Sequence, residues 1–167
     1  MALECTDKQM TDMLDEHLPY EVAMMLVAHD LMYPEPRVSP GIAQNAMIEC
    51  FCIPARNLFE FLTMKGGGGK NYAFAKAYVP SFDAFRDPQT NADKDDLYKK
   101  ICEQITHLSF NRVKHDEAKV RRDVEVPATA KLLLPEIGGF AIALERDEHR
   151  RAWEVGVRKV GLSRWGF

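Results

Sequence analysis

Apolar residues recur every three or four positions along most of this chain, and that spacing constrains the fold more than any other feature. It is clearest in three segments, 6–33, 41–64 and 93–112. Such spacing places side chains on one face of an α-helix, whereas a half-buried strand needs alternation at every second residue. Strand signals are weak, and there is no internal repeat. The sequence therefore predicts an all-α protein, a helical bundle of five or six helices.

Prolines interrupt two of these segments and predict where helices begin or bend. Pro19 favours two helices within 6–33, the first ending at Leu18 and the second with Pro19 in its first turn, where proline is tolerated. Pro54 lies in the middle of 41–64, where it removes a backbone hydrogen bond. We therefore expect this second segment to be bent or split.

The rest of the chain completes a predicted single domain that spans residues 1–167. Four consecutive glycines between two lysines make 65–70 a flexible loop, because so many glycines are too costly in conformational entropy for a helix. The highly charged segment 113–126 is predicted to be an exposed linker. A last long helix is expected over about 127–151, in which the glycine pair 138–139 either lets another helix approach closely or marks a break.

Composition restricts the class of protein. The chain has 167 residues, of which 46% are hydrophobic and 28% charged, and this is enough to bury a core. Its net charge of -3 argues against a protein whose whole surface binds phosphates. The charge is uneven, with 10 basic against 16 acidic residues in 1–109 and 12 against 9 in 110–167. The basic excess in 110–167 is either ordinary solvated surface or a patch for RNA or an acidic partner.

Several kinds of site and location are not supported by any motif. Residues 1–9 contain no hydrophobic run, and no stretch approaches the roughly 20 apolar residues of a membrane span. We therefore expect a cytoplasmic protein with reduced cysteines and no membrane partner. No histidines or cysteines have metal-ligand spacing, and Met64 and Asn71 replace the glycine and hydroxyl residue of a P-loop. Neither a metal nor a cofactor is expected.

One flank of the predicted 93–112 helix is polar and centres on His107. The members of this flank are Lys100, Gln104, His107 and Asn111. A neutral imidazole among amides could act as a general acid or base near pH 7. The alternative is an ordinary solvated or hydrogen-bonded histidine.

A second polar cluster follows Pro54, where freed backbone groups need polar partners. Arg56 and Glu60 are four residues apart, which predicts a surface ion pair. The functional alternative is a guanidinium held near the seam of the bundle for a phosphate. The candidate binding residues are Asn57, Glu60, Gln104 and Asn111.

Two segments, 48–62 (IECFCIPARNLFEFL) and 101–112 (ICEQITHLSFNR), together match a pattern known from other proteins. The matching residues are Ala55, Arg56, Leu58, Phe61, His107, Leu108, Ser109 and Arg112. In these residues the chain resembles small bacterial helical proteins that are distant relatives of the HEPN superfamily. The resemblance implies a HEPN-like up-down bundle, and it implies a metal-independent ribonuclease that uses His107 with Arg56 or Arg112.

The chain departs from this family pattern in two places. Pro54 occupies the position, two residues before the arginine, where the pattern often has a histidine. HEPN ribonucleases also place a histidine four to six residues after an arginine, and this spacing does not occur in the chain. The departures put the usual ribonuclease activity in doubt.

Three functions are therefore considered. The first is a non-enzymatic bundle that binds a protein partner or forms a homodimer, with a second copy covering the aromatics Trp153, Trp165 and Phe167. The second is a HEPN-like, RNA-directed ribonuclease or toxin-type enzyme. The third is a bundle that binds a small ligand in an apolar pocket.

Overall fold

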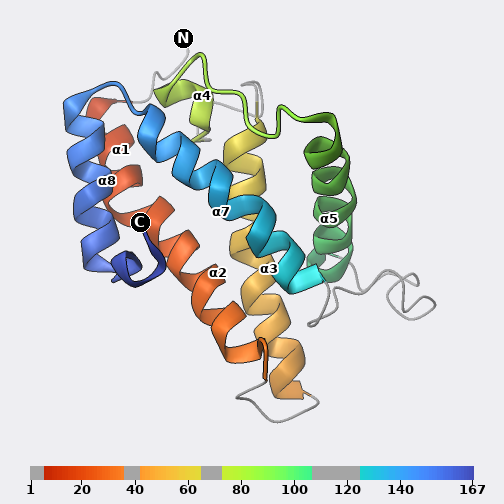
Figure 1. The fold of residues 1–167 in the computed structure, drawn as a ribbon. Coiled ribbons are helices and arrows are strands. Elements are labelled where there is room, and N and C mark those ends of the chain that lie inside the picture. The colour runs from red at the N-terminus through yellow and green to blue at the C-terminus, as the bar shows by residue number, and fades with distance from the viewer. Residues whose placement is uncertain (1–5, 36–41, 65–72, 107–124) are drawn as a thin grey trace.

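The computed structural model describes residues 6–35, 42–64, 73–106 and 125–167, and these ranges form helices, turns and short connections without a β-strand (Figure 1). The elements are α1 (Asp7–Asp12), a π-helix (Met13–His17), α2 (Leu18–Met32), α3 (Ile42–Thr63), α4 (Ala75–Tyr78), α5 (Pro88–Thr106), α7 (Glu125–Ala143), α8 (Asp147–Lys159) and a 3₁₀ turn (Leu162–Trp165). Five of these helices have thirteen residues or more. The predicted all-α bundle is confirmed.

The first helical segment is continuous, in contrast to the predicted pair of separate helices. α1 ends at Asp12 and joins α2 through the π-helix, in which the Leu18 N–H donates to the Met13 carbonyl. Pro19 lies in the first turn of α2, as predicted. Because proline has no N–H to continue the α-helical ladder, the wider π turn accommodates the change of register here.

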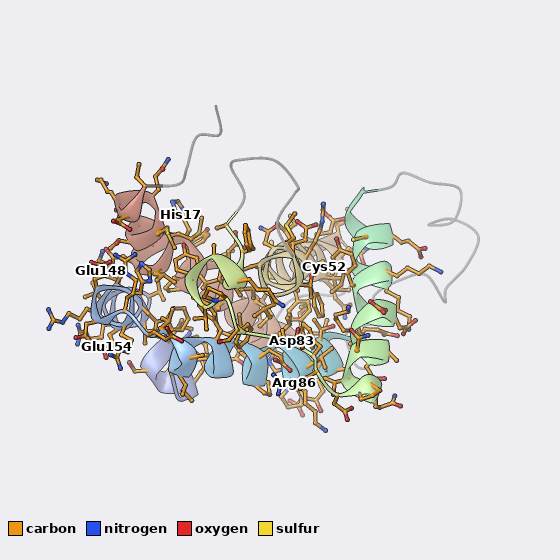
Figure 2. All side chains as sticks on the ribbon, turned by 90° about the horizontal axis from the view of Figure 1, so that it is seen from above. His17, Cys52, Asp83, Arg86, Glu148 and Glu154 are labelled. Carbon is orange, nitrogen blue, oxygen red and sulfur yellow. The ribbon has the colours of Figure 1, made fainter. Side chains whose placement is uncertain are left out.

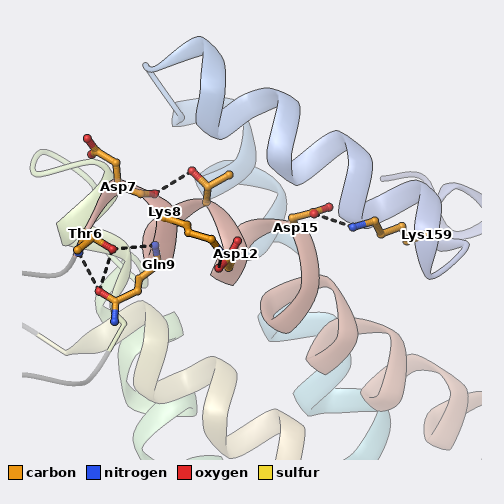
Figure 3. A network of polar contacts seen from close by, with 8 residues as sticks. Thr6, Asp7, Lys8, Gln9, Asp12, Asp15 and Lys159 are labelled. Atoms are coloured by element: carbon orange, nitrogen blue, oxygen red, sulfur yellow. Dashed lines mark hydrogen bonds and ion pairs between the residues drawn. The ribbon is translucent and has the colours of Figure 1, made fainter.

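Polar contacts hold the start of this segment and its π-helix (Figure 3). A capping box begins α1, in which the Thr6 hydroxyl accepts from the Gln9 N–H and the Gln9 side chain accepts from the Thr6 N–H. At the π-helix, the Lys159 ammonium lies 2.6 Å from a carboxylate oxygen of Asp15. This ion pair connects α8 to the π-helix.

α2 and α3 form an antiparallel pair at the centre of the bundle (Figure 1). α3 runs unbroken past Pro54, which is buried, so the helix is not split. α7 packs against α2 and α3, α5 contacts α3 and α7, and α8 contacts α1, the π-helix and α2. The buried apolar side chains of all these helices belong to one cluster.

Two predicted boundaries after α5 are wrong. The charged linker was expected to reach residue 126, but Glu125 and Val126 are buried in the first turn of α7, where the Lys100 ammonium lies 3.5 Å from the Glu125 carboxylate. The helix expected over 127–151 consists of α7 and α8, which are separated by residues 144–146. The rest of the predicted linker and the glycine loop 65–70 lie outside the described residues.

The glycine that allows a close helix approach is Gly156, not the predicted pair. Gly138 and Gly139 lie inside α7, and a Cβ added to either would meet nothing within 4 Å. A Cβ added at Gly156 would lie 2.6 Å from the Asp15 carbonyl oxygen and 2.6 Å from Cγ of Pro19. α8 therefore packs directly on the backbone of the π-helix.

The C-terminal aromatics pack on their own chain. Trp153 belongs to α8 and is buried, and the Phe167 ring lies 6.1 Å from it. The Trp165 indole donates a 3.1 Å hydrogen bond to Asp30 of α2. These contacts use part of the aromatic surface within one molecule. Trp165 and Phe167 stay partly exposed, and a second copy that covers them stays a prediction.

His149 is a buried histidine whose ring nitrogens have no hydrogen-bond partner in the structure. Its ring packs edge-on against Tyr78 of α4, and the charged groups of Arg146, Glu148 and Asp7 act on it. Burial, and secondarily Arg146, lowers the pKa of His149 from its ordinary value of 6.5. The folded protein therefore favours the neutral imidazole.

This lowered pKa predicts a pH-dependent stability. Because the unfolded chain binds the proton more readily, the contribution of His149 to stability is complete above pH 6.5 and decreases as the pH falls through the unfolded-state pKa. Urea unfolding should show that the free energy of unfolding decreases more between pH 7.5 and pH 5.5 for the wild type than for His149→Phe. Equal losses in the two proteins would contradict the buried, neutral state of His149.

Candidate functional site

α2 has apolar residues on every side, including the side that other helices do not cover. Its inner side contributes several fully buried residues to the core, and α7 packs there. The outer stripe consists of Tyr20, Met24, Val27 and Leu31. Tyr20 is 53% exposed and Val27 38% exposed. A helix that is apolar all round is usually buried on all sides, so the outer stripe of α2 lacks a covering partner within the described residues.

α3 extends this apolar surface. Ile53 is 49% exposed and Cys50, one turn before it, is partly exposed. Figure 2, a view from above, shows α7 on one side of the α2 and α3 pair and His17 on the other. We call the surface on this second side the α2–α3 face. It comprises the outer stripe of α2 together with Cys50 and Ile53, which lie two turns and one turn before Asn57 on α3, a residue hydrogen-bonded to Glu21 of α2.

A pocket of about 320 Å³ lies at one end of the α2–α3 face, between the start of α2 and the end of α3. Its lining residues are Met13, His17, Leu18, Glu21, Asn57, Leu58, Glu60, Phe61, Met64 and Ala73. Leu18, Leu58 and Phe61 are buried and apolar, whereas Glu21 and Glu60 contribute carboxylates. An apolar lining with a few polar groups is the usual character of a binding pocket.

The negative charge of the Glu60 carboxylate is compensated by an ion pair with Arg56. Glu60 Oε1 accepts hydrogen bonds from Arg56 Nε at 2.8 Å and from the Tyr98 hydroxyl at 2.9 Å. The hydrogen bond to Glu60 raises the pKa of Arg56, and burial together with the same carboxylate raises the pKa of Tyr98 to about 12. Arg56 therefore stays charged and Tyr98 stays a donor at neutral pH. This geometry fits the predicted ion pair rather than a guanidinium held for phosphate.

The Glu21 carboxylate has no such compensation. Its Oε1 accepts a 3.0 Å hydrogen bond from the Asn57 side chain. Among the described side chains, no cation lies within ion-pair distance of Glu21. Since an amide neutralises no charge, Glu21 gives the pocket a net negative character.

The structure places only part of the predicted site. Of the predicted binding residues, Asn57 and Glu60 line the pocket, and Arg56 lies beside it. Gln104 belongs to α5, but its side chain is outside the described part of the structure, as are His107, Asn111 and Arg112.

Sequence reasoning missed Glu21 and Tyr98. Glu21 had a detectable signal, because it is the only charged residue in the apolar run from Leu18 to Ala28. Tyr98 follows the apolar spacing of its helix, and the direction of its hydroxyl toward Glu60 depends on how α5 packs on α3. That packing is a long-range property which helix periodicity does not contain.

A second pocket, of about 530 Å³, lies between α5 and α7 and contains several carboxylates. These groups are engaged within the bundle: Asp87 accepts the backbone N–H groups of Gln89 and Thr90, which lowers its pKa. Lys100 lies 2.9 Å from Asp96 and 3.5 Å from Glu125. Asp87 and Asp93 accept only from uncharged donors, so this pocket also carries negative charge, but the outer apolar stripe of α2 leads to the pocket beside Glu21.

Neither a metal site nor strong membrane character emerges. No group of three His, Cys, Asp or Glu side chains in the described ranges could hold a metal ion. α7 is long and apolar enough to cross a membrane, with a mean hydropathy of 1.2 over its best window. Core helices pass the same test, and seven residues of α7 are buried in the bundle, so this is weak evidence for a span.

Comparisons with family models, with curated proteins and with solved structures gave no match. The resemblance to HEPN proteins therefore stays a hypothesis, as does the ribonuclease that it implies. The case for a function rests on the geometry of the α2–α3 face and its pocket.

Proposed function

We propose that this protein is a non-enzymatic binding protein that docks a helical segment of another protein on the α2–α3 face. The observation that supports the proposal is the outer apolar stripe of α2, which lies opposite α7 and leads to the pocket beside Glu21. Contiguous exposed apolar surface on a folded protein marks an interaction site. Two neighbouring helices with an apolar seam are suited to an amphipathic helix laid along them.

The test is a selection of displayed helical peptides on the wild-type protein, followed by binding measurements on two variants. Val27→Glu places a charge in the middle of the stripe, whereas Ile142→Glu places the same charge at an isoleucine on α7 that is 87% exposed. We expect selected peptides to lose more than about 100-fold in affinity on Val27→Glu, because a buried, unpaired carboxylate is costly. Their affinity for Ile142→Glu should be unchanged.

Two outcomes would contradict the proposal. One is a selection that yields no helical binder, and the other is a set of binders that Val27→Glu retains at full affinity. Circular dichroism and unfolding of both variants serve as the control for folding. Val27 and Ile142 are both exposed, so neither substitution should disturb the core.

A further inference from the structure

We infer that the segment docked on the α2–α3 face is a basic amphipathic helix, one of whose lysine or arginine side chains enters the pocket beside Glu21. This inference rests on the proposed function and specifies its partner. Three features support it: the charge of the helices that form the face, the construction of the pocket, and the helical spacing of the stripe.

The helices that form the face are strongly acidic. Residues 13–32 and 42–63 contain six carboxylates and a single basic residue, Arg56, which gives -5 with histidines neutral. Arg56 is paired with Glu60, and Asp15 is paired with Lys159 of α8. Glu16 and Glu21 have no cation within ion-pair distance among the described side chains. A partner with positive charge is therefore attracted to this face and oriented on it.

The pocket is built for a side chain with an apolar stem and a cationic end. Leu18, Leu58 and Phe61 provide apolar contact for methylene groups. The Asn57 amide holds Glu21 through one carboxylate oxygen, Oε1. Lysine and arginine bury their stems along apolar surface while their charge stays at a polar rim, so either residue matches both parts of the pocket.

The spacing of the outer stripe favours a helical partner. The stripe members Tyr20, Met24, Val27 and Leu31 follow the spacing of one helical ridge, which is about 16 Å long at 1.5 Å per residue. Ridges of this kind pack into the groove of a second helix. The described ranges contain no sheet edge to which an extended peptide could add a strand.

A second copy of this chain fits the face less well. The spacing of the stripe, four, three and four residues, is the same in both directions, so two copies could align their stripes antiparallel. Such a pair would bring together two copies of the same acidic helices, with Glu21 of each copy beside the interface, and like charges that face each other across an interface oppose association. A basic helix would contact the same apolar stripe and would be attracted by the negative charge of α2 and α3.

The inference is tested with three stapled helical peptides that share one leucine face and differ only in their flanks, which carry lysine, glutamine or glutamate. Fluorescence anisotropy gives their affinities for the wild type and for Glu21→Gln. We expect the affinity to be highest for the lysine peptide, lower for the glutamine peptide and lowest for the glutamate peptide. The affinity of the lysine peptide should fall about tenfold on Glu21→Gln, and raised salt should weaken its binding to the wild type. Glu154→Gln on α8 removes the same charge from an exposed position as a matched control and should change nothing.

The outcomes separate this inference from the function on which it rests. Lysine and glutamine peptides that bind equally, with no effect of Glu21→Gln, would overturn the basic partner and leave the docking surface in place. A failure of all three peptides, or binding that survives Val27→Glu, would overturn the docking surface itself. A dimer of the free protein that Val27→Glu dissociates would assign the face to a second copy and would also overturn the inference.

Discussion

Phe140→Ala should lower the free energy of unfolding by about 3–5 kcal/mol, the usual cost of removing a fully buried phenylalanine side chain. Phe140 lies on the inner side of α7 and is 0% exposed. Its ring meets those of Phe61, Tyr78 and Phe82 edge-on, at centroid distances of 5.0, 5.9 and 5.6 Å. The substitution leaves a cavity between α3, α4 and α7 and removes these aromatic contacts. Urea unfolding followed by circular dichroism measures the loss.

Ile142→Ala is the matched control for this substitution. Ile142 lies on the same helix two residues later but is 87% exposed, so its truncation should change stability by no more than about 0.5 kcal/mol. If the two variants were equally stable, α7 would not be packed on α3 and α4 as described. The α2–α3 face would then no longer be defined as the side opposite α7.

Gly156→Ala should destabilise the protein by about 1–3 kcal/mol, although alanine is the better helix former. A Cβ at this position would lie 2.6 Å from the Asp15 carbonyl oxygen and 2.8 Å from that of Leu14, and backbone atoms cannot move aside as a flexible side chain can. α8 must therefore shift away from the π-helix, which also weakens the Lys159 ion pair with Asp15. Thermal and urea unfolding both report the change.

Gly139→Ala provides the control of opposite sign. Gly139 is exposed on α7 with nothing within 4 Å of an added Cβ, so the substitution should stabilise the protein by up to about 1 kcal/mol. Changes in stability of opposite sign for the two substitutions are expected only if α8 packs on the backbone of the π-helix. A stabilising Gly156→Ala would contradict that contact.

The all-α class was predictable because helix periodicity is a local property of the sequence. The positions where one helix ends and the next begins were not predictable in this way. Pro19 signalled an interruption, but the π-helix that absorbs it depends on how α8 and its Gly156 pack on the same backbone. The break between α7 and α8 falls at residues 144–146, which contain neither glycine nor proline. A break was one of the two roles predicted for Gly138 and Gly139, and α7 continues through both residues.

The candidate site was predictable only where its contacts are local. Arg56 and Glu60 pair within one helix, so their spacing predicted the contact. The hydrogen bonds from Asn57 to Glu21 and from Tyr98 to Glu60 join residues 36 and 38 positions apart, and they require the packing of three helices. The contacts of Trp165 and Phe167 are long-range or depend on the turn after α8: the Trp165 indole donates to Asp30 of α2, and the Phe167 ring lies against Trp153.

The most direct test of the docking surface is hydrogen–deuterium exchange of the protein with and without the lysine-flanked helical peptide. Binding on the α2–α3 face should slow exchange in α2 and α3, and in Val27→Glu this protection should be lost. The pocket between α5 and α7 provides the internal comparison, because exchange around it should not change. Protection confined to α5 and α7, or protection of α2 and α3 that persists in Val27→Glu, would contradict the account.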